Sequence, residues 1–304
     1  MKKTMLYGSL LLTQCLIWGI GNPIMKIGLE VVPPFLCLAI RFILAFMIFL
    51  LFFGRKVFAN VSAGHLTAYL TVSAFTAASF IFSAFALIYT TATNTGFLMG
   101  TAVIFTPFLS YFILKSKIDK RHVLPIVLVT FGLYLLCSGG GSLTFGVGEV
   151  FALLCAVTGA GMLVFSSKYL QEIDPIMISV MQTGFTGLFC LIITLLIEGM
   201  PDLSAIPSVG WGSIGYLAIG CTCIAYLFQN TALRNVPATF VALAFCTEPI
   251  FTAIASYWIL GEVLTRKVIA GAVLILVSIL MASLFPEEHS VVSAGLSLQA
   301  DPES

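Results

Sequence analysis

Long apolar runs separated by short polar stretches make up most of the chain. Residues 57–114 contain no Asp, Glu, Lys or Arg. A membrane-spanning helix needs about 20 apolar residues, so this run is long enough for two helices. The polar stretch TTATNTG at 90–96 predicts the turn that joins them.

The same pattern along the chain predicts ten membrane-spanning helices, and therefore an all-α integral membrane protein. Their expected ranges are 5–29, 34–53, 66–89, 94–114, 122–138, 147–167, 175–197, 209–230, 237–260 and 267–285. Residues 286–304 are polar and acidic and lack helical periodicity, which predicts a disordered cytoplasmic tail. Most Lys and Arg residues fall in the connections that share a side with the N-terminus, so both termini are expected in the cytoplasm.

A faint internal repeat divides the chain. Pro34 opens the second span with Arg41 seven residues later, and Pro175 opens the seventh with Gln182 at the same distance. Both pairs lie near the start of their spans. The spacing therefore indicates two related halves.

A second match fixes the extent of these halves. Residues 86–98 resemble residues 232–244 at an offset of 146. The predicted repeats are 1–138 and 147–285, with five spans each. An odd number of spans inserts the second repeat upside down, and such inverted repeats are typical of secondary transporters that hold substrate at the repeat interface.

Composition and charge agree with a membrane protein. Hydrophobic residues make up 60% of the chain and charged residues 9%, against about 25% charged in soluble domains. The net charge of +1 gives no basic field for nucleic acid. The eight cysteines lie in apolar stretches and are expected to be small buried hydrophobes.

Polar side chains inside the spans are candidates for a functional site, because the bilayer makes them costly. In the first span, Trp18 and Asn22 are expected to line a cavity beside the helix interruption at Pro23. The alternative is a tolerated kink, with Lys26 reaching the interface. Further candidates for the cavity are Gln182, Tyr226 and Gln229.

Two charged residues lie deeper in the spans. Arg41 either grips an anionic substrate group, or pairs with Glu248 in a link that breaks during transport, or is structural. Glu248 precedes Pro249 near the middle of the ninth span. It is a proton-coupling group, a counter-charge to a substrate amine, or a structural acceptor at a kinked helix.

The sequence argues against an enzyme. His65 and His122 begin spans and His289 lies in the tail, so no histidine can act as a base or metal ligand at mid-membrane. No phosphate-binding glycine loop with a following lysine is present. No catalytic residue, metal or cofactor is expected.

Several of these residues carry a family resemblance. They are Glu248-Pro249, Leu260-Gly261-Glu262 and a glycine-containing last span in the second half, and Trp18-Gly19, Lys26, Pro34 and Arg41-Phe42 in the first. Over nearly all of residues 5–285 the chain resembles the EamA-type repeat of the drug/metabolite transporter superfamily. The resemblance implies a ten-helix carrier of the plasma (inner) membrane, commonly an exporter of amino acids, other metabolites or toxic compounds.

The chain departs from that pattern at one end of the first half. Leu114 is followed by Lys115-Ser116-Lys117, where the second half has Gly261-Glu262 after Leu260. Because Glu262 lies at a helix end, it is interpreted as a gating or structural residue, together with Pro23, Lys26, Pro249 and Gly261.

The hypothesis is a secondary active transporter that moves small metabolites by alternating access, with export of amino acids or related amphipathic compounds as the first expectation. The alternative is an importer of a sugar- or nucleoside-like solute. A receptor-like or purely structural membrane protein is a further alternative. The expected partners are a small metabolite and the lipid bilayer. Coupling to protons and assembly into a homodimer stay open.

Overall fold

The structure, a computed structural model, describes residues 2–115, 123–137, 146–199, 202–263 and 265–284. All regular secondary structure within these ranges is helical. The α-helices are α1 (Lys2–Val31), α2 (Pro34–Asn60), α3 (Leu66–Tyr89), α4 (Ala92–Gly100), α5 (Ala102–Leu114), α6 (Val123–Cys137), α7 (Val147–Tyr169), α8 (Pro175–Ile193), α9 (Ser208–Ala218), α10 (Ala225–Leu233), α11 (Ala238–Phe245), α12 (Glu248–Leu260) and α13 (Arg266–Leu284). Two π-helical turns, η3 (Thr194–Glu198) and η5 (Ile219–Ile224), extend α8 and join α9 to α10.

The chain is a multi-pass membrane protein. Within the described residues, eight helical segments are long and apolar enough to cross a bilayer, and α6 contains a shorter apolar run at Val123–Gly132. The expected count of ten spans stays a prediction. The expected tail, 286–304, and most of the polar connection after α6 lie outside the described residues.

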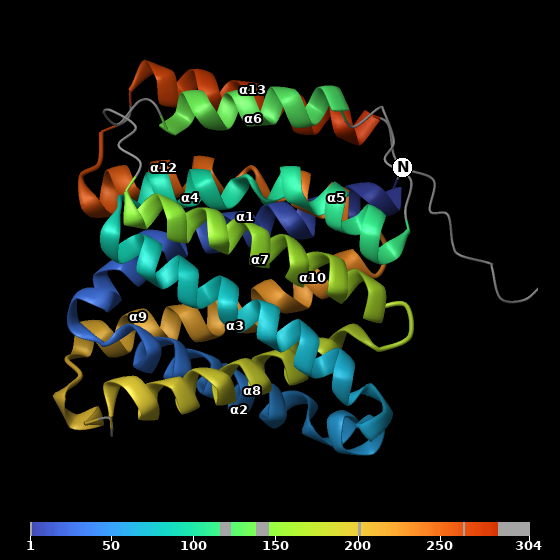
Figure 1. Ribbon diagram of the computed structural model, residues 1–304, viewed down its shortest axis with the longest axis vertical. Coiled ribbons are helices and arrows are strands. Elements are labelled where there is room, and N and C mark those ends of the chain that lie inside the picture. Colours follow the sequence, from blue (N-terminus) through green and yellow to red (C-terminus); the bar gives the residue numbers. More distant parts are fainter. Residues whose placement is uncertain (1, 116–122, 138–145, 200–201, 264, 285–304) are drawn as a thin grey trace, which may run out of the picture.

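The helices lie side by side with their axes close to parallel or antiparallel (Figure 1). The pair α6 and α13 forms one end of the array and the pair α2 and α8 the other. Between these pairs, α7 packs on α3, α4 and α5, while α1 packs on α9, α10, α11 and α12. The first helix of each half therefore contacts the third and fourth segments of the other half.

The interruption between α4 and α5 matches the interruption between α11 and α12. Thr101 donates its hydroxyl to Leu98 O at 2.5 Å, and Thr247 donates its hydroxyl to Ala244 O at 2.8 Å. Both pairs are separated by the offset of 146 found in the sequence. The same local bond pattern therefore breaks the helix at the same place in each half.

The far ends of these segments also correspond. Lys115 and Gly261, again 146 residues apart, each end a helix with left-handed backbone, at φ values of 53° and 69°. Their backbone N–H groups bond to Ser110 O and Ser256 O, which are related by the same offset. Glycine adopts this conformation without strain, whereas the lysine side chain makes it less favourable.

Candidate functional site

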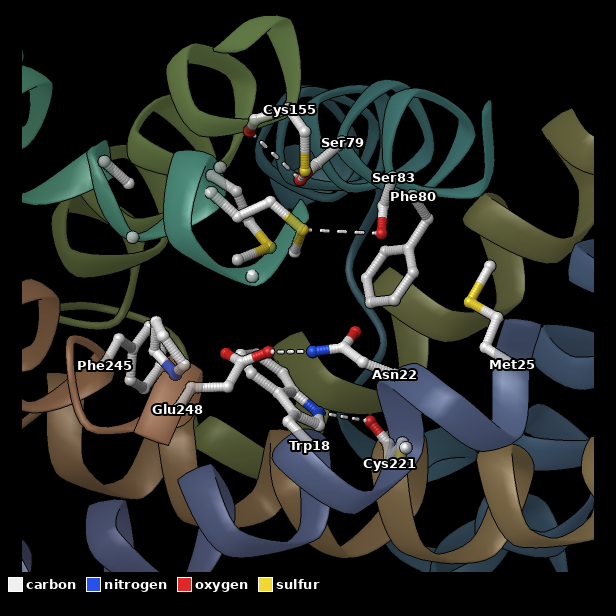
Figure 2. A pocket seen from close by; sticks show the side chains of 18 of the residues that line it. Trp18, Asn22, Met25, Ser79, Phe80, Ser83, Cys155, Cys221, Phe245 and Glu248 are labelled. Atoms are coloured by element: carbon white, nitrogen blue, oxygen red, sulfur yellow. Dashed lines mark hydrogen bonds between the residues drawn. The ribbon is translucent and has the colours of Figure 1, made fainter. Parts of the chain in front are cut away.

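A cavity of about 100 Å³ lies between the two halves. Residues of α1, α2, α3, α4, α5 and α7 line it together with residues of α9, η5, α11 and α12. Figure 2 shows Glu248, Asn22 and Trp18 on one side of the space and Ser79, Ser83 and Phe80 on the facing side. The cavity therefore combines polar and charged groups with a largely apolar wall.

The break between α11 and α12 accounts for the position of Glu248. α11 ends at Phe245 and a new helix begins at Glu248, and Pro249 is compatible with this break because proline does not fit a helix interior. Pro249 then occupies the first turn of α12, where its missing donor costs nothing. Glu248 stands at the positive end of the α12 dipole, which favours a carboxylate.

Asn22 joins α1 to α12 at the cavity wall. Its Nδ2 donates to Glu248 Oε1 at 2.9 Å and to Thr252 Oγ1 at 3.0 Å. The two helices can approach this closely because Gly19 faces α12. A Cβ at Gly19 would lie 2.4 Å from the Cβ of Phe251. Asn22 and Glu248 are both buried.

Trp18 forms the aromatic part of the same wall. Its Nε1 donates to Cys221 O at 2.8 Å. Its ring meets Phe245 edge to face at a centroid distance of 5.2 Å, and Tyr226 at 6.2 Å. Since the indole N–H is bonded, the ring has a fixed orientation beside the cavity.

Arg41 lines the cavity from α2. Its Nε donates to Thr222 Oγ1 at 2.8 Å, and a terminal nitrogen lies 3.4 Å from Cys221 O. Its guanidinium carbon lies 4.5 Å from the ring centroid of Phe80. In the described part of the chain Arg41 forms no ion pair, so the pair with Glu248 considered from the sequence is not present in this conformation.

The π-helical turn η5 supplies the acceptors for Trp18 and Arg41. The Ala225 N–H donates to Gly220 O, five residues back, and not to the Cys221 carbonyl that an α-helix would use. Cys221 O accepts from the two side chains instead. Such local π-turns are frequent at functional sites.

Three other candidate residues from the sequence do not line the cavity. Gln182 donates to Thr76 Oγ1 at 2.7 Å. The Tyr226 hydroxyl lies 3.9 Å from a methionine sulfur behind Trp18, and Gln229 accepts from Gln14 at 3.1 Å. All three are fully buried between helices, where such bonds hold the bundle together.

Of the candidate gating residues, Lys26, Gly261 and Glu262 lie towards one end of the helices, whereas Pro249 lines the cavity. Lys26 donates to Thr90 O at 2.7 Å, next to the turn that opens α4. Glu262 accepts from Ala92 N and from the Thr93 hydroxyl, and so caps α4. Pro23 lies inside α1, which continues through it without a break.

Some of the lining residues and their partners were not identified from the sequence. Thr252 lies one turn after Glu248, so the helical spacing could have placed both on one face. Thr222 and Phe80 carry no comparable signal. Thr222 reaches Arg41 from the π-turn, and Phe80 reaches it where α3 packs against α2.

A charged cluster lies at the opposite end of the helices. Asp174 Oδ2 lies 3.0 Å from Lys56 Nζ and 4.0 Å from an Arg234 nitrogen. Burial alone would raise the pKa of Asp174, but hydrogen bonds from Lys56 and the Ile176 N–H, together with the two cations, lower this pKa below its usual value. Asp174 also caps α8 through the Ile176 bond.

A metal site is absent from the part of the chain that the structure describes, because no three His, Cys, Asp or Glu side chains are grouped to hold an ion. Glu248 is the single acid among the described cavity residues.

The comparisons with known proteins agree with this architecture. A solved crystal structure that is 16% identical superposes with a TM-score of 0.73 and covers 93% of this chain and 97% of its own, which shows the fold. An uncharacterized transporter of Archaeoglobus fulgidus is 28% identical, over 92% of this chain and 86% of its own. A protein of Salmonella typhimurium named a probable amino-acid metabolite efflux pump is 26% identical, over 88% and 92%.

The family comparison covers both halves. The model of the EamA-like transporter family matches residues 5–138 and again residues 146–284. The chain therefore belongs to the EamA-like transporter family.

Proposed function

We propose that this protein is a secondary active transporter that exports amino acids or related amphipathic metabolites. The cavity between the halves carries this proposal. It presents a cation at Arg41 and an acid at Glu248 against a wall that includes Trp18, Phe80 and Phe245. An amino acid with an apolar side chain has matching charges and a matching apolar body. The name of the Salmonella relative supports the same substrate class.

The proposed architecture is ten spans in two inverted five-helix repeats. The matched breaks at Thr101 and Thr247 and the matched ends at Lys115 and Gly261 support a structural repeat. The distribution of Lys and Arg supports cytoplasmic termini in the plasma membrane. The two halves would rock about the cavity between them.

Polar links at the two ends of the helices are the proposed closing contacts. At one end Lys26 and Glu149 both bond Thr90, at 2.7 and 2.6 Å. At the other end Asp174 joins Lys56 to Arg234. Alternating access requires the Thr90–Glu149 link and the Lys56–Asp174 link to break in turn, because each of these two joins segments from different halves.

Glu248 is the proposed proton-coupling residue. Ala102 occupies the equivalent position in the first half, and the helix breaks there in the same way. The break therefore does not require an acid. The carboxylate of Glu248 is then available for a proton or a substrate amine.

The test is counterflow of radiolabelled amino acids into liposomes that contain the purified protein. Uptake above that of empty liposomes supports a transporter of this class, and no uptake of any amino acid contradicts it. Expression in cells exposed to toxic amino-acid analogues gives the direction, because an exporter confers resistance. Sensitised cells, or counterflow of sugars or nucleosides only, would favour the importer alternative.

A further inference from the structure

Arg41 carries a charge that the surrounding protein does not neutralise. Its side chain is 1% exposed, and among the described residues no carboxylate lies within 4.0 Å of the guanidinium. Nε has a short bond to Thr222. The terminal nitrogens have only a 3.4 Å contact with Cys221 O and a 3.9 Å contact with Met25 Sδ. Guanidinium has five N–H donors, so two of them have no partner among the described residues and two more have only these weak contacts.

Aromatic rings hold this guanidinium at the cavity wall. Its central carbon lies 4.5 Å from the Phe80 ring centroid and 5.2 Å from that of Phe42. Ring faces attract a cation without neutralising it. Arg41, Phe80 and Met25 all line the cavity. The cation is therefore fixed beside the cavity between the two halves.

The fold does not need a cation at this position. The equivalent residue in the second half, seven residues after the proline that opens α8, is Gln182. Gln182 bonds Thr76 and Asn230 away from the cavity. The same helix is thus built in the other half with a neutral side chain. A structural role alone does not explain a buried charge that costs desolvation energy.

We propose that the terminal nitrogens of Arg41 bind the carboxylate of the substrate. A guanidinium fork matches a carboxylate in shape and charge, through two parallel hydrogen bonds. The inference rests on the proposed function and narrows it to substrates that carry a carboxylate on an apolar body. It leaves Glu248, the single acid among the described lining residues, for an amine or a proton.

The test uses competition against radiolabelled L-leucine counterflow in liposomes. The competitors are 4-methylpentanoate, which keeps the carboxylate, and L-leucinamide and 3-methylbutylamine, which lack it. Because a hydrogen bond to a charged group accounts for about a 10- to 100-fold change in affinity, the acid should inhibit at least tenfold better than either compound without a carboxylate. Equal inhibition by L-leucinamide and L-leucine would overturn the inference while the proposed function stands.

Variants of Arg41 test whether this residue causes the preference for the acid over the amide. Arg41→Gln should reduce the preference for acid over amide to about twofold, and Arg41→Lys should keep part of it, because a lysine retains charge but not the fork. Arg55→Gln, at an exposed position on the same helix, is the control and should keep the full preference. A full preference in Arg41→Gln would also overturn the inference. The ratio of the two inhibition constants is the readout, because a merely structural loss lowers both affinities together.

Two further outcomes are a variant that does not fold and a protein that does not exchange amino acids, and each still allows the inference to be tested. If Arg41→Gln does not fold, Arg41→Lys and the competition pattern of the wild type decide the question. If L-leucine and other amino acids do not exchange at all, the proposed function fails. Thermal stabilisation of the wild type by 4-methylpentanoate is then compared with stabilisation by 4-methylpentanamide. A shift specific to the acid and reduced in Arg41→Lys supports the subsite, and equal shifts with the acid and the amide overturn it.

Discussion

The substitution Glu248→Gln tests whether the cavity carboxylate couples transport to protons. The amide oxygen of glutamine can still accept the 2.9 Å bond from Asn22, so the wall of the cavity should keep its shape. Exchanging a charge-assisted bond for a neutral one costs about 1 kcal/mol. Removing a buried charge acts in the opposite direction. We therefore expect no loss of stability beyond about 1 kcal/mol.

The expected size of the effect on proton-coupled accumulation follows from the number of acidic side chains that line the cavity. Glu248 is the single carboxylate among the described lining residues, so at most one proton per cycle is expected at this site. One proton per substrate lets a pH gradient of one unit support a concentration ratio of up to about tenfold, since a tenfold ratio corresponds to about 1.4 kcal/mol. Glu248→Gln should reduce this ratio to about onefold while exchange without a gradient continues.

The assay is amino-acid accumulation in liposomes with an imposed pH gradient and the membrane potential held at zero. Glu198→Gln is the matched control. Its two carboxylate oxygens accept the N–H groups of Phe35 and Leu36 at 2.9 and 2.8 Å, away from the cavity. This control should lower stability by about 1 kcal/mol and keep the response to the gradient. A Glu248→Gln protein that still accumulates substrate tenfold would refute the coupling role.

Three further substitutions test the packing and the polar links. Gly19→Ala should destabilise the protein by about 1–3 kcal/mol in thermal unfolding, because the new Cβ would lie 2.4 Å from that of Phe251. Gly8→Ala, with open space around it, should be neutral, and equal effects would contradict this packing. Glu262→Gln should lower the free energy of unfolding by about 1 kcal/mol, because it weakens the cap on α4, and counterflow should continue. Loss of counterflow with unchanged stability would instead indicate a gating role. Asp174→Asn should cost less than about 1 kcal/mol, since the ion pairs are partly exposed. The pKa of Asp174 is lower in the folded protein than its unfolded value of about 3.9. The ionised side chain therefore stabilises the fold above this unfolded pKa, and the stabilisation is lost as the pH falls from there through the folded-state pKa. Unfolding of Asp174→Asn should depend less on pH in this acidic range than unfolding of the wild type.

The repeat is the part of the fold that the sequence predicts best. The offset of 146 between residues 86–98 and 232–244 also relates Thr101 to Thr247 and Lys115 to Gly261 in the structure. This agreement has a local cause, because each break depends on bonds within one turn of the helix. Local patterns of this kind can be read from a sequence.

The polar partners within the cavity could not be predicted in the same way. Arg41 and Gln182 occupy equivalent positions, yet one lines the cavity and the other lies between helices. Which way a side chain faces depends on how α2 and α8 are rotated against their neighbours. Arg41 also meets Thr222 across 181 positions of sequence, a contact that no local pattern indicates.

Accessibility of one cavity residue tests the central claim most directly. Ser83 lines the cavity, so Ser83→Cys in a chain with its eight cysteines replaced by alanine gives a single reporter. The account predicts that a membrane-impermeant thiol reagent modifies this cysteine from either side of the membrane, and that a transported amino acid slows the reaction from both sides. Reaction from one side only, or no protection by any amino acid that exchanges, would contradict the claim that the halves alternately open one substrate cavity.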